Sequence, residues 1–221
     1  MAYSLNDFVL SEPRVLPVIL AVDKSGSMQT GGKIDAMNLA LNEFISSISN
    51  EDSGRVKIQV AIYSFGSDVS CDVPLQDVSN IKVPQYSASG RTPMGETFLR
   101  IKELIEDKTL IPSRSYKPTI VLLTDGDPTD DIQHPLYNLV SEGRSSKAFR
   151  IAMGIGEDAN KEMLSLFVSD PAYLVSGDNA RDIRKFFRFV TMSVTQRTRS
   201  TNPDVVVTPV SMPGDDILDY G

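Results

Sequence analysis

The chain has 221 residues, of which 41% are hydrophobic, so it is long enough to bury one substantial core without disulfides. Its formal net charge of -7 argues against a nucleic-acid or anionic-membrane binder, because such surfaces need clustered Lys and Arg. One cysteine, Cys71, and one histidine, His134, exclude an intrachain disulfide, a thiolate zinc cluster and a histidine-rich metal site. The first ten residues lack the pattern of a signal peptide and no apolar run is long enough to span a membrane, so we expect a cytoplasmic protein.

Apolar runs and helical periodicities alternate along the chain. Residues Arg14–Val22 form a nearly continuous apolar run that ends in Asp23, as expected for a central parallel strand. After a Gly/Ser loop, residues 33–49 repeat apolar side chains every three or four positions, which predicts a helix packed on a sheet. Val56–Phe65 is predicted as the second strand, and Val69–Val73 as a short antiparallel edge strand.

The second half of the chain continues this alternation. A polar loop, residues 76–91, leads to a helix with Pro93 in its first turn, where the missing N–H is not needed. The further predicted elements are strand Pro118–Thr124, helix Leu136–Ser145, strand Phe149–Ile155, helix Lys161–Phe167, strand Tyr173–Val175 and helix Ala180–Arg197. The order predicts an α/β fold: a doubly wound, mostly parallel, Rossmann-like sheet with one short antiparallel edge strand and helices on both faces. Ligands of such sheets lie beyond the carboxyl ends of the strands.

The periodic pattern covers most of the chain but not its ends. We expect an N-terminal extension at 1–13, a domain at 14–198 and an acidic, proline-containing tail at 199–221. The tail includes the β-prone segment Val205–Val207. It is interpreted as a flexible tail, with an added edge strand or a docking peptide as alternatives.

Oxygen-bearing side chains gather in three loops that this fold brings together. The loops are Asp23–Ser27 and Thr124–Gly126, at the ends of two strands, and Gly90–Pro93, before a helix. They offer two carboxylates and three hydroxyls, on Asp23, Ser25, Ser27, Thr92 and Asp125. Such a set suits a hard cation, Mg²⁺ first, with Mn²⁺ or Ca²⁺ as alternatives. Because hydroxyls add no charge, the cation would keep its electrophilic character toward one further oxygen ligand.

The pattern Asp23-x-Ser25-x-Ser27, followed by Thr92 and Asp125 in later loops, resembles the metal-ion-dependent adhesion site (MIDAS) of von Willebrand factor A (VWA) domains. The similarity covers roughly residues 16–194. It implies a non-catalytic module for protein–protein interaction, in which the serines and the threonine touch the metal directly. The aspartates then contact the metal through water or change their contact with it when a ligand binds. An Asp or Glu of a partner protein completes the coordination shell of the metal.

The local amino-acid sequences of the three loops narrow the resemblance to a smaller group within this family. Asp23–Met28, Thr92–Glu96 and Leu123–Asp130 are most similar to bacterial cytoplasmic members of the tellurium-resistance TerY-like group. Members of that group are associated with a protein kinase and a PP2C-type phosphatase in stress-response systems. The resemblance therefore implies partners of these two kinds, and no nucleic acid or membrane.

Two other functions stay open at this point. A haloacid-dehalogenase-type phosphatase also places an aspartate after a central strand, but it needs a second carboxylate two residues on, where this chain has Ser25. Asp127 and Asp130 resemble its later acidic motif, although they and Asp131 are expected to be solvent-facing turn formers. In a metal-free scaffold, the residues after Asp23 would only cap the next helix. A phosphate loop at residues 31–33 fails on spacing.

Overall fold

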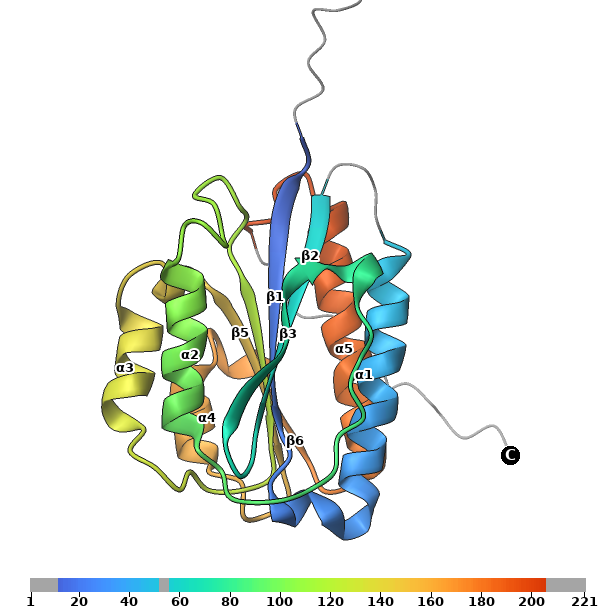
Figure 1. Ribbon diagram of the computed structural model, residues 1–221, viewed down its shortest axis with the longest axis vertical. Helices are drawn as coiled ribbons and strands as arrows, with labels where there is room; N and C mark the ends of the chain where they lie inside the picture. Colours follow the sequence, from blue (N-terminus) through green and yellow to red (C-terminus); the bar gives the residue numbers. More distant parts are fainter. Residues whose placement is uncertain (1–11, 52–55, 206–221) are drawn as a thin grey trace, which may run out of the picture.

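A six-stranded sheet between two layers of helices forms the core of the protein (Figure 1). The computed structural model describes residues 12–51 and 56–205. The strand order is β3-β2-β1-β4-β5-β6, with β3 antiparallel to β2 and every other neighbouring pair parallel. The strands are β1 (Arg14–Asp23), β2 (Val56–Phe65), β3 (Val69–Asp77), β4 (Thr119–Thr124), β5 (Phe149–Ile155) and β6 (Leu174–Gly177). The predicted fold class is confirmed.

Helices cover both faces of the sheet. Figure 1 shows α1 and α5 on one face and α2, α3 and α4 on the other. The helices are α1 (Lys33–Ser49), α2 (Met94–Glu106), α3 (Gln133–Ser141), α4 (Lys161–Phe167) and α5 (Ala180–Arg199), and the 3₁₀ turns are η2 (Gly26–Gly32), η3 (Val78–Asn80), η4 (Ser145–Lys147) and η5 (Pro171–Tyr173). Among the described residues, no helix combines the length and the apolar character that a membrane span requires.

The buried strand β1 shows why the sheet forms. Every residue of β1 from Leu16 to Asp23 is buried, because helices cover both sides of the strand. A run that is apolar on both faces is stable only in such a central position. Asp23, the last residue of β1, is buried as well, so its carboxylate lies at the end of the core without contact to bulk water.

Several elements differ from their predicted bounds by one or two residues, and β3 and α3 differ most. The edge strand β3 continues to Asp77, past the predicted end at Val73. Helix α3 begins at Gln133 and ends at Ser141, whereas the periodicity predicted residues 136–145. Pro135 lies in the first turn of α3, where a proline removes no hydrogen bond of the helix. Residues 145–147 form the separate turn η4.

The point where the chain reverses its direction of sheet growth lies between β1 and β4. These strands are hydrogen-bonded neighbours, with Val22 paired to Leu123, although about a hundred residues separate them. The chain passes from β1 to β2 on one side and places β4 on the other. Asp23 ends β1 and Asp125 directly follows β4, so both carboxylates lie at this switch point, where open α/β sheets bind ligands.

The beginning of the predicted tail packs against the domain. The backbone N–H of Lys117 donates to Asp204 Oδ1 at 2.7 Å. The side chain of Arg197 donates from Nε to the carbonyl oxygen of Pro203 at 2.8 Å. Residues 206–221, with most of the β-prone segment, and residues 1–11 of the predicted extension lie outside the described part of the chain.

Backbone contacts lock the loop before α2 onto the loop after β1. Gly26 donates its N–H to the carbonyl oxygen of Gly90 at 3.1 Å, and Ser89 donates to that of Lys24 at 2.7 Å. Gly90 has φ of +84°, and a Cβ atom there would lie 2.1 Å from the backbone nitrogen of Ser67. Only glycine fits this crossing, which places Thr92 beside the end of β1.

We predict that Gly90→Ala lowers the free energy of unfolding by roughly 3 kcal/mol or more, because a left-handed backbone and a steric clash act together. The control is Gly31→Ala, which has a similar φ of +66° but no atom within 4 Å of the added Cβ. It should lose only about 1 kcal/mol. Urea unfolding followed by circular dichroism measures both values, and equal losses would contradict the prediction.

Candidate metal centre

The carboxylate of Asp23 is buried and receives only neutral donors. Its Oδ1 accepts the backbone N–H of Ser25 at 2.7 Å, and its Oδ2 accepts the hydroxyl of Thr124 at 2.6 Å. Burial raises the pKa of Asp23 to about 6, assisted by the negative charge of Asp125, while the hydrogen bonds from Ser25 and Thr124 act in the opposite direction. An ionised Asp23 therefore lacks a compensating cation among the described residues.

The second carboxylate, Asp125, is fully buried at the start of the β4–α3 loop. Its Oδ1 accepts the hydroxyl of Ser27 at 2.6 Å, and its Oδ2 forms an ion pair with the ammonium group of Lys33. The hydroxyl oxygens of Ser25 and Ser27 are 3.0 Å apart. A continuous chain of polar contacts thus joins Ser25, Ser27, Asp125 and Lys33.

Thr92 lies at the same edge of the sheet and brings the third hydroxyl. Its backbone N–H donates to Thr129 Oγ1 at 3.2 Å, and its carbonyl oxygen accepts the N–H of Thr129 at 3.0 Å. Its Oγ1 lies 3.5 Å from the position that a Cβ atom on Gly126 would take. Thr92 as a residue is only 5% exposed, but its hydroxyl is not among the buried atoms that lack a partner, and in the described part of the chain it makes no hydrogen bond to another residue, so it remains accessible.

The structure therefore brings all five predicted ligand residues to one edge of the sheet, at the lower end of the view in Figure 1. Ser27 directs its only proton to Asp125, so its oxygen accepts in the contact with Ser25 and keeps one lone pair free for a cation. Within residues 12–51 and 56–205, no cluster of three or more His, Cys, Asp or Glu side chains suits a metal. This edge differs in kind, because three of its five candidate ligand side chains are hydroxyls. Two carboxylates and three neutral hydroxyls fit a hard divalent cation.

Three residues with a role at this edge were not among the predicted ligands. Lys33 pairs with Asp125, and Thr124 holds Asp23. Asp130 accepts the backbone N–H groups of Gly95 at 3.0 Å and Glu96 at 2.9 Å, so it caps helix α2 across two loops. Asp130 was expected to face solvent as a turn former. It is exposed, but its carboxylate also caps α2, which the sequence did not predict.

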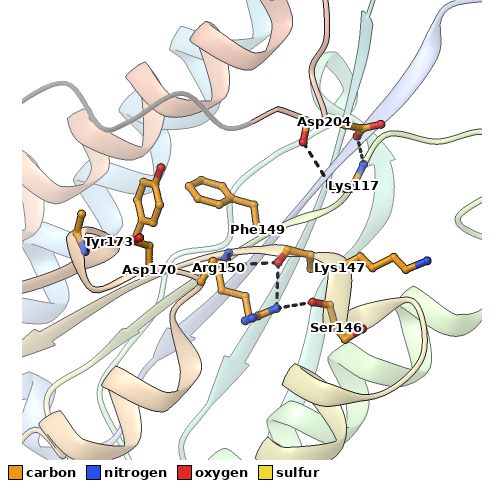
Figure 2. A pocket seen from close by; sticks show the side chains of 11 residues that line it. Lys117, Ser146, Lys147, Phe149, Arg150, Asp170, Tyr173 and Asp204 are labelled. Carbon is orange, nitrogen blue, oxygen red and sulfur yellow. Dashed lines mark hydrogen bonds between the residues drawn. The ribbon is translucent and has the colours of Figure 1, made fainter.

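A cavity of about 490 Å³ lies at the opposite edge of the sheet, at the amino ends of β4 and β5 (Figure 2). Arg150 lies in its wall, and its guanidinium donates to the carbonyl oxygens of Phe167 at 2.6 Å, Ala148 at 2.9 Å and Ser146 at 3.3 Å. Burial lowers the pKa of Arg150. The arginine thus ties the end of α4 to η4 and the connection between η4 and β5, and we assign it a structural role.

The buried charge of Asp23 predicts a distinctive pH dependence of the metal-free protein. Because the folded-state pKa of about 6 lies above the ordinary value of 3.8, the folded protein binds the proton more tightly than the unfolded chain. Stability from this group should therefore rise as the pH falls from about 7 to about 4. At pH 7, Asp23→Asn should be more stable than the unsubstituted protein by roughly 3 kcal/mol, and this difference should shrink toward zero near pH 4.

Urea unfolding of both proteins in chelator, at several pH values, checks this prediction. The difference between the two proteins removes the contributions of all other titrating groups. A difference that stays constant with pH would show that the charge of Asp23 carries no such energetic cost.

The sequence profile of the von Willebrand factor type A domain matches residues 18–189. Inter alpha-trypsin inhibitor heavy chain 4 of Mus musculus is 28% identical over 190 residues, which are 78% of this chain and 19% of that protein. The corresponding human protein is 26% identical over 191 residues, 78% of this chain and 20% of that protein. The chain thus spans about a fifth of the length of these curated relatives.

Solved structures agree on the fold. The pilus adhesin SpaC of Lactobacillus rhamnosus GG, in an open conformation, has a TM-score of 0.66 and 18% identity over 84% of this chain and 30% of its own. Proximal thread matrix protein 1 from the mussel byssus, with a zinc-occupied MIDAS motif, has a TM-score of 0.59 and 18% identity over 81% of this chain and 48% of its own. The chain belongs to the von Willebrand factor type A domain family, a family of protein-interaction modules of which some bind a metal ion.

Proposed function

We propose that this chain is a metal-dependent protein-interaction module. Ser25, Ser27 and Thr92 would bind a divalent cation directly, and Asp23 and Asp125 would support it through water or by direct contact. The last ligand would be an Asp or Glu side chain of a partner protein. When bound, the cation supplies an electrophilic centre for that carboxylate.

The observation that carries this proposal is the unpartnered hydroxyl of Thr92. This hydroxyl is not among the buried polar atoms that lack a partner, so water, or a cation that enters the site, can reach it. Thr92 sits beside a network in which Ser27 already gives its proton to a carboxylate. Oxygen lone pairs therefore collect at one edge, which is the environment that a cation needs.

Mg²⁺ is the cation that we favour, with Mn²⁺ and Ca²⁺ as alternatives. Hard cations select oxygen ligands, and Mg²⁺ is usually held by one or two carboxylates together with water. Two carboxylates and three hydroxyls match this preference more closely than that of zinc, which mostly takes nitrogen and sulfur. The zinc in the MIDAS motif of the mussel protein is a property of that structure and does not decide which metal this chain binds.

We also propose that the module is not an enzyme. The position two residues after Asp23, where a phosphatase of the haloacid-dehalogenase type needs its general acid, holds Ser25, whose N–H binds Asp23. Asp130, one of the residues that resembled the later acidic motif, caps α2. Hydrolysis of p-nitrophenyl phosphate that requires Mg²⁺ and disappears in Asp23→Asn would overturn this assignment.

The tellurium-resistance affiliation stays a prediction. It rests on the local amino-acid sequences of the three loops. The same resemblance is the basis for expecting a protein kinase and a PP2C-type phosphatase as partners, and a bacterial, cytoplasmic setting. A stress-response role is the finer part of our proposal, and copurification of this chain with a kinase or phosphatase from its native host would test it.

Removal of the Thr92 hydroxyl tests the metal site. We predict that Thr92→Ala weakens Mg²⁺ binding roughly tenfold or more, because a direct ligand is lost. The matched control is Thr191→Ala, which removes a hydroxyl bonded to the carbonyl oxygen of Phe187 within α5. Isothermal titration calorimetry with MgCl₂ measures all three proteins.

Two results would count against the proposal. If MgCl₂ and MnCl₂ gave no heat with the unsubstituted protein, the chain would be a metal-free scaffold. If Thr92→Ala lost no affinity, Thr92 would not be a ligand. A pull-down with Mg²⁺ and with chelator extends the test to the bridge, because the Thr92→Ala variant should retain no Mg²⁺-dependent partner.

A further inference from the structure

Lys33 is the one cation that reaches the candidate metal centre in the described structure. Its side chain is 17% exposed, while the Asp125 side chain that it contacts is 0% exposed. In every other ion pair found among the described residues, both side chains are more exposed than their counterparts here. The Lys33–Asp125 pair is therefore the one least screened by solvent.

The sequence places this lysine against the preference of its own helix. Lys33 is the first residue of α1, where the positive end of the helix dipole disfavours a cation. Gly31 and Gly32 have φ of +66° and +70° and turn the chain sharply from η2 into α1. A local rule broken at a site of converging charge indicates a functional reason.

The charges at this edge show what the lysine does. Asp23 and Asp125 carry two negative charges, and Lys33 reduces the sum to one. A divalent cation then leaves the site with one positive charge, which the carboxylate of an acidic ligand would neutralise. Without Lys33, the divalent cation alone would neutralise the two aspartates, and a further carboxylate would make the site negative.

We propose that Lys33 is a tethered competitor of the metal at Asp125, which weakens binding of the cation alone and couples it to binding of a carboxylate ligand. This inference rests on the proposed function and adds its regulation. Metal and acidic ligand then bind cooperatively, because each offsets the charge left by the other. Lys33 is a positioning residue in this scheme, since it acts through Asp125.

Neutralisation of Lys33 gives the first test. In calorimetric titration with MgCl₂, Lys33→Gln should bind the ion roughly ten- to a hundredfold more tightly than the unsubstituted protein. Lys33→Arg, which keeps the charge, should resemble the unsubstituted protein. The matched control is Lys57→Gln, which breaks an ion pair with Asp77 at 3.1 Å near the amino end of β2, and its affinity should change less than about twofold.

Coupling to a carboxylate gives the second test, which a merely structural role of Lys33 would not affect. Titrations are repeated in sodium acetate and in sodium chloride at equal ionic strength. Acetate should raise the Mg²⁺ affinity of the unsubstituted protein and of Lys57→Gln, and it should raise that of Lys33→Gln less or not at all. Equal acetate effects in all three proteins would overturn the inference.

Thermal unfolding shows whether the variant folds. In chelator, Lys33→Gln should melt at a lower temperature, because Asp125 is left buried without its cation, and Mg²⁺ should raise its melting temperature more than that of the unsubstituted protein. A variant that folds only with Mg²⁺ would support the same conclusion. Equal or weaker Mg²⁺ binding by Lys33→Gln would overturn the inference alone, whereas no Mg²⁺ binding by any of the proteins would overturn the proposed function and the inference with it.

Discussion

The structure is organised around two like charges buried at the ends of neighbouring parallel strands. Strands β1 and β4 pair at the switch point of the sheet. This pairing places Asp23, at the end of β1, near Asp125, which directly follows β4. Each of the four carboxylate oxygens receives a donor from the protein, but only Asp125 receives a positive one. Burial of an unpaired carboxylate is unfavourable, so the surrounding loops, caps and hydroxyls are arranged around this remaining charge.

The fold was largely accessible from the sequence, because it depends on patterns that local residues carry. Continuous apolar runs predicted β1, β2, β4 and β5, and the three- to four-residue repeats predicted the main helices. The ends of elements were less accessible. Helix α3 begins earlier than its apolar repeat because Pro135 is tolerated in a first turn, and the edge strand β3 extends beyond its β-prone part because it keeps pairing with β2.

The candidate site was accessible only in part. The motif after β1 and the positions of Thr92 and Asp125 could be read from residue type and context, and the structure brings these side chains together, while their role as ligands stays a prediction. The partners of the carboxylates could not be read. Thr124 reaches Asp23 across 101 positions and Lys33 reaches Asp125 across 92, and such contacts depend on strand register and helix placement rather than on spacing in the sequence.

The cap that Asp130 places on α2 has a consequence for how this edge can move. Asp130 belongs to the same loop as Asp125, yet it holds the first turn of the helix that follows Thr92, and Thr129 is bonded to the backbone of Thr92 itself. Two loops that are separate in sequence are thus fastened into one mechanical unit. A displacement that begins at Asp125 would therefore also move α2 as a whole. A local change at this edge of the sheet would then alter one side of the domain along its length.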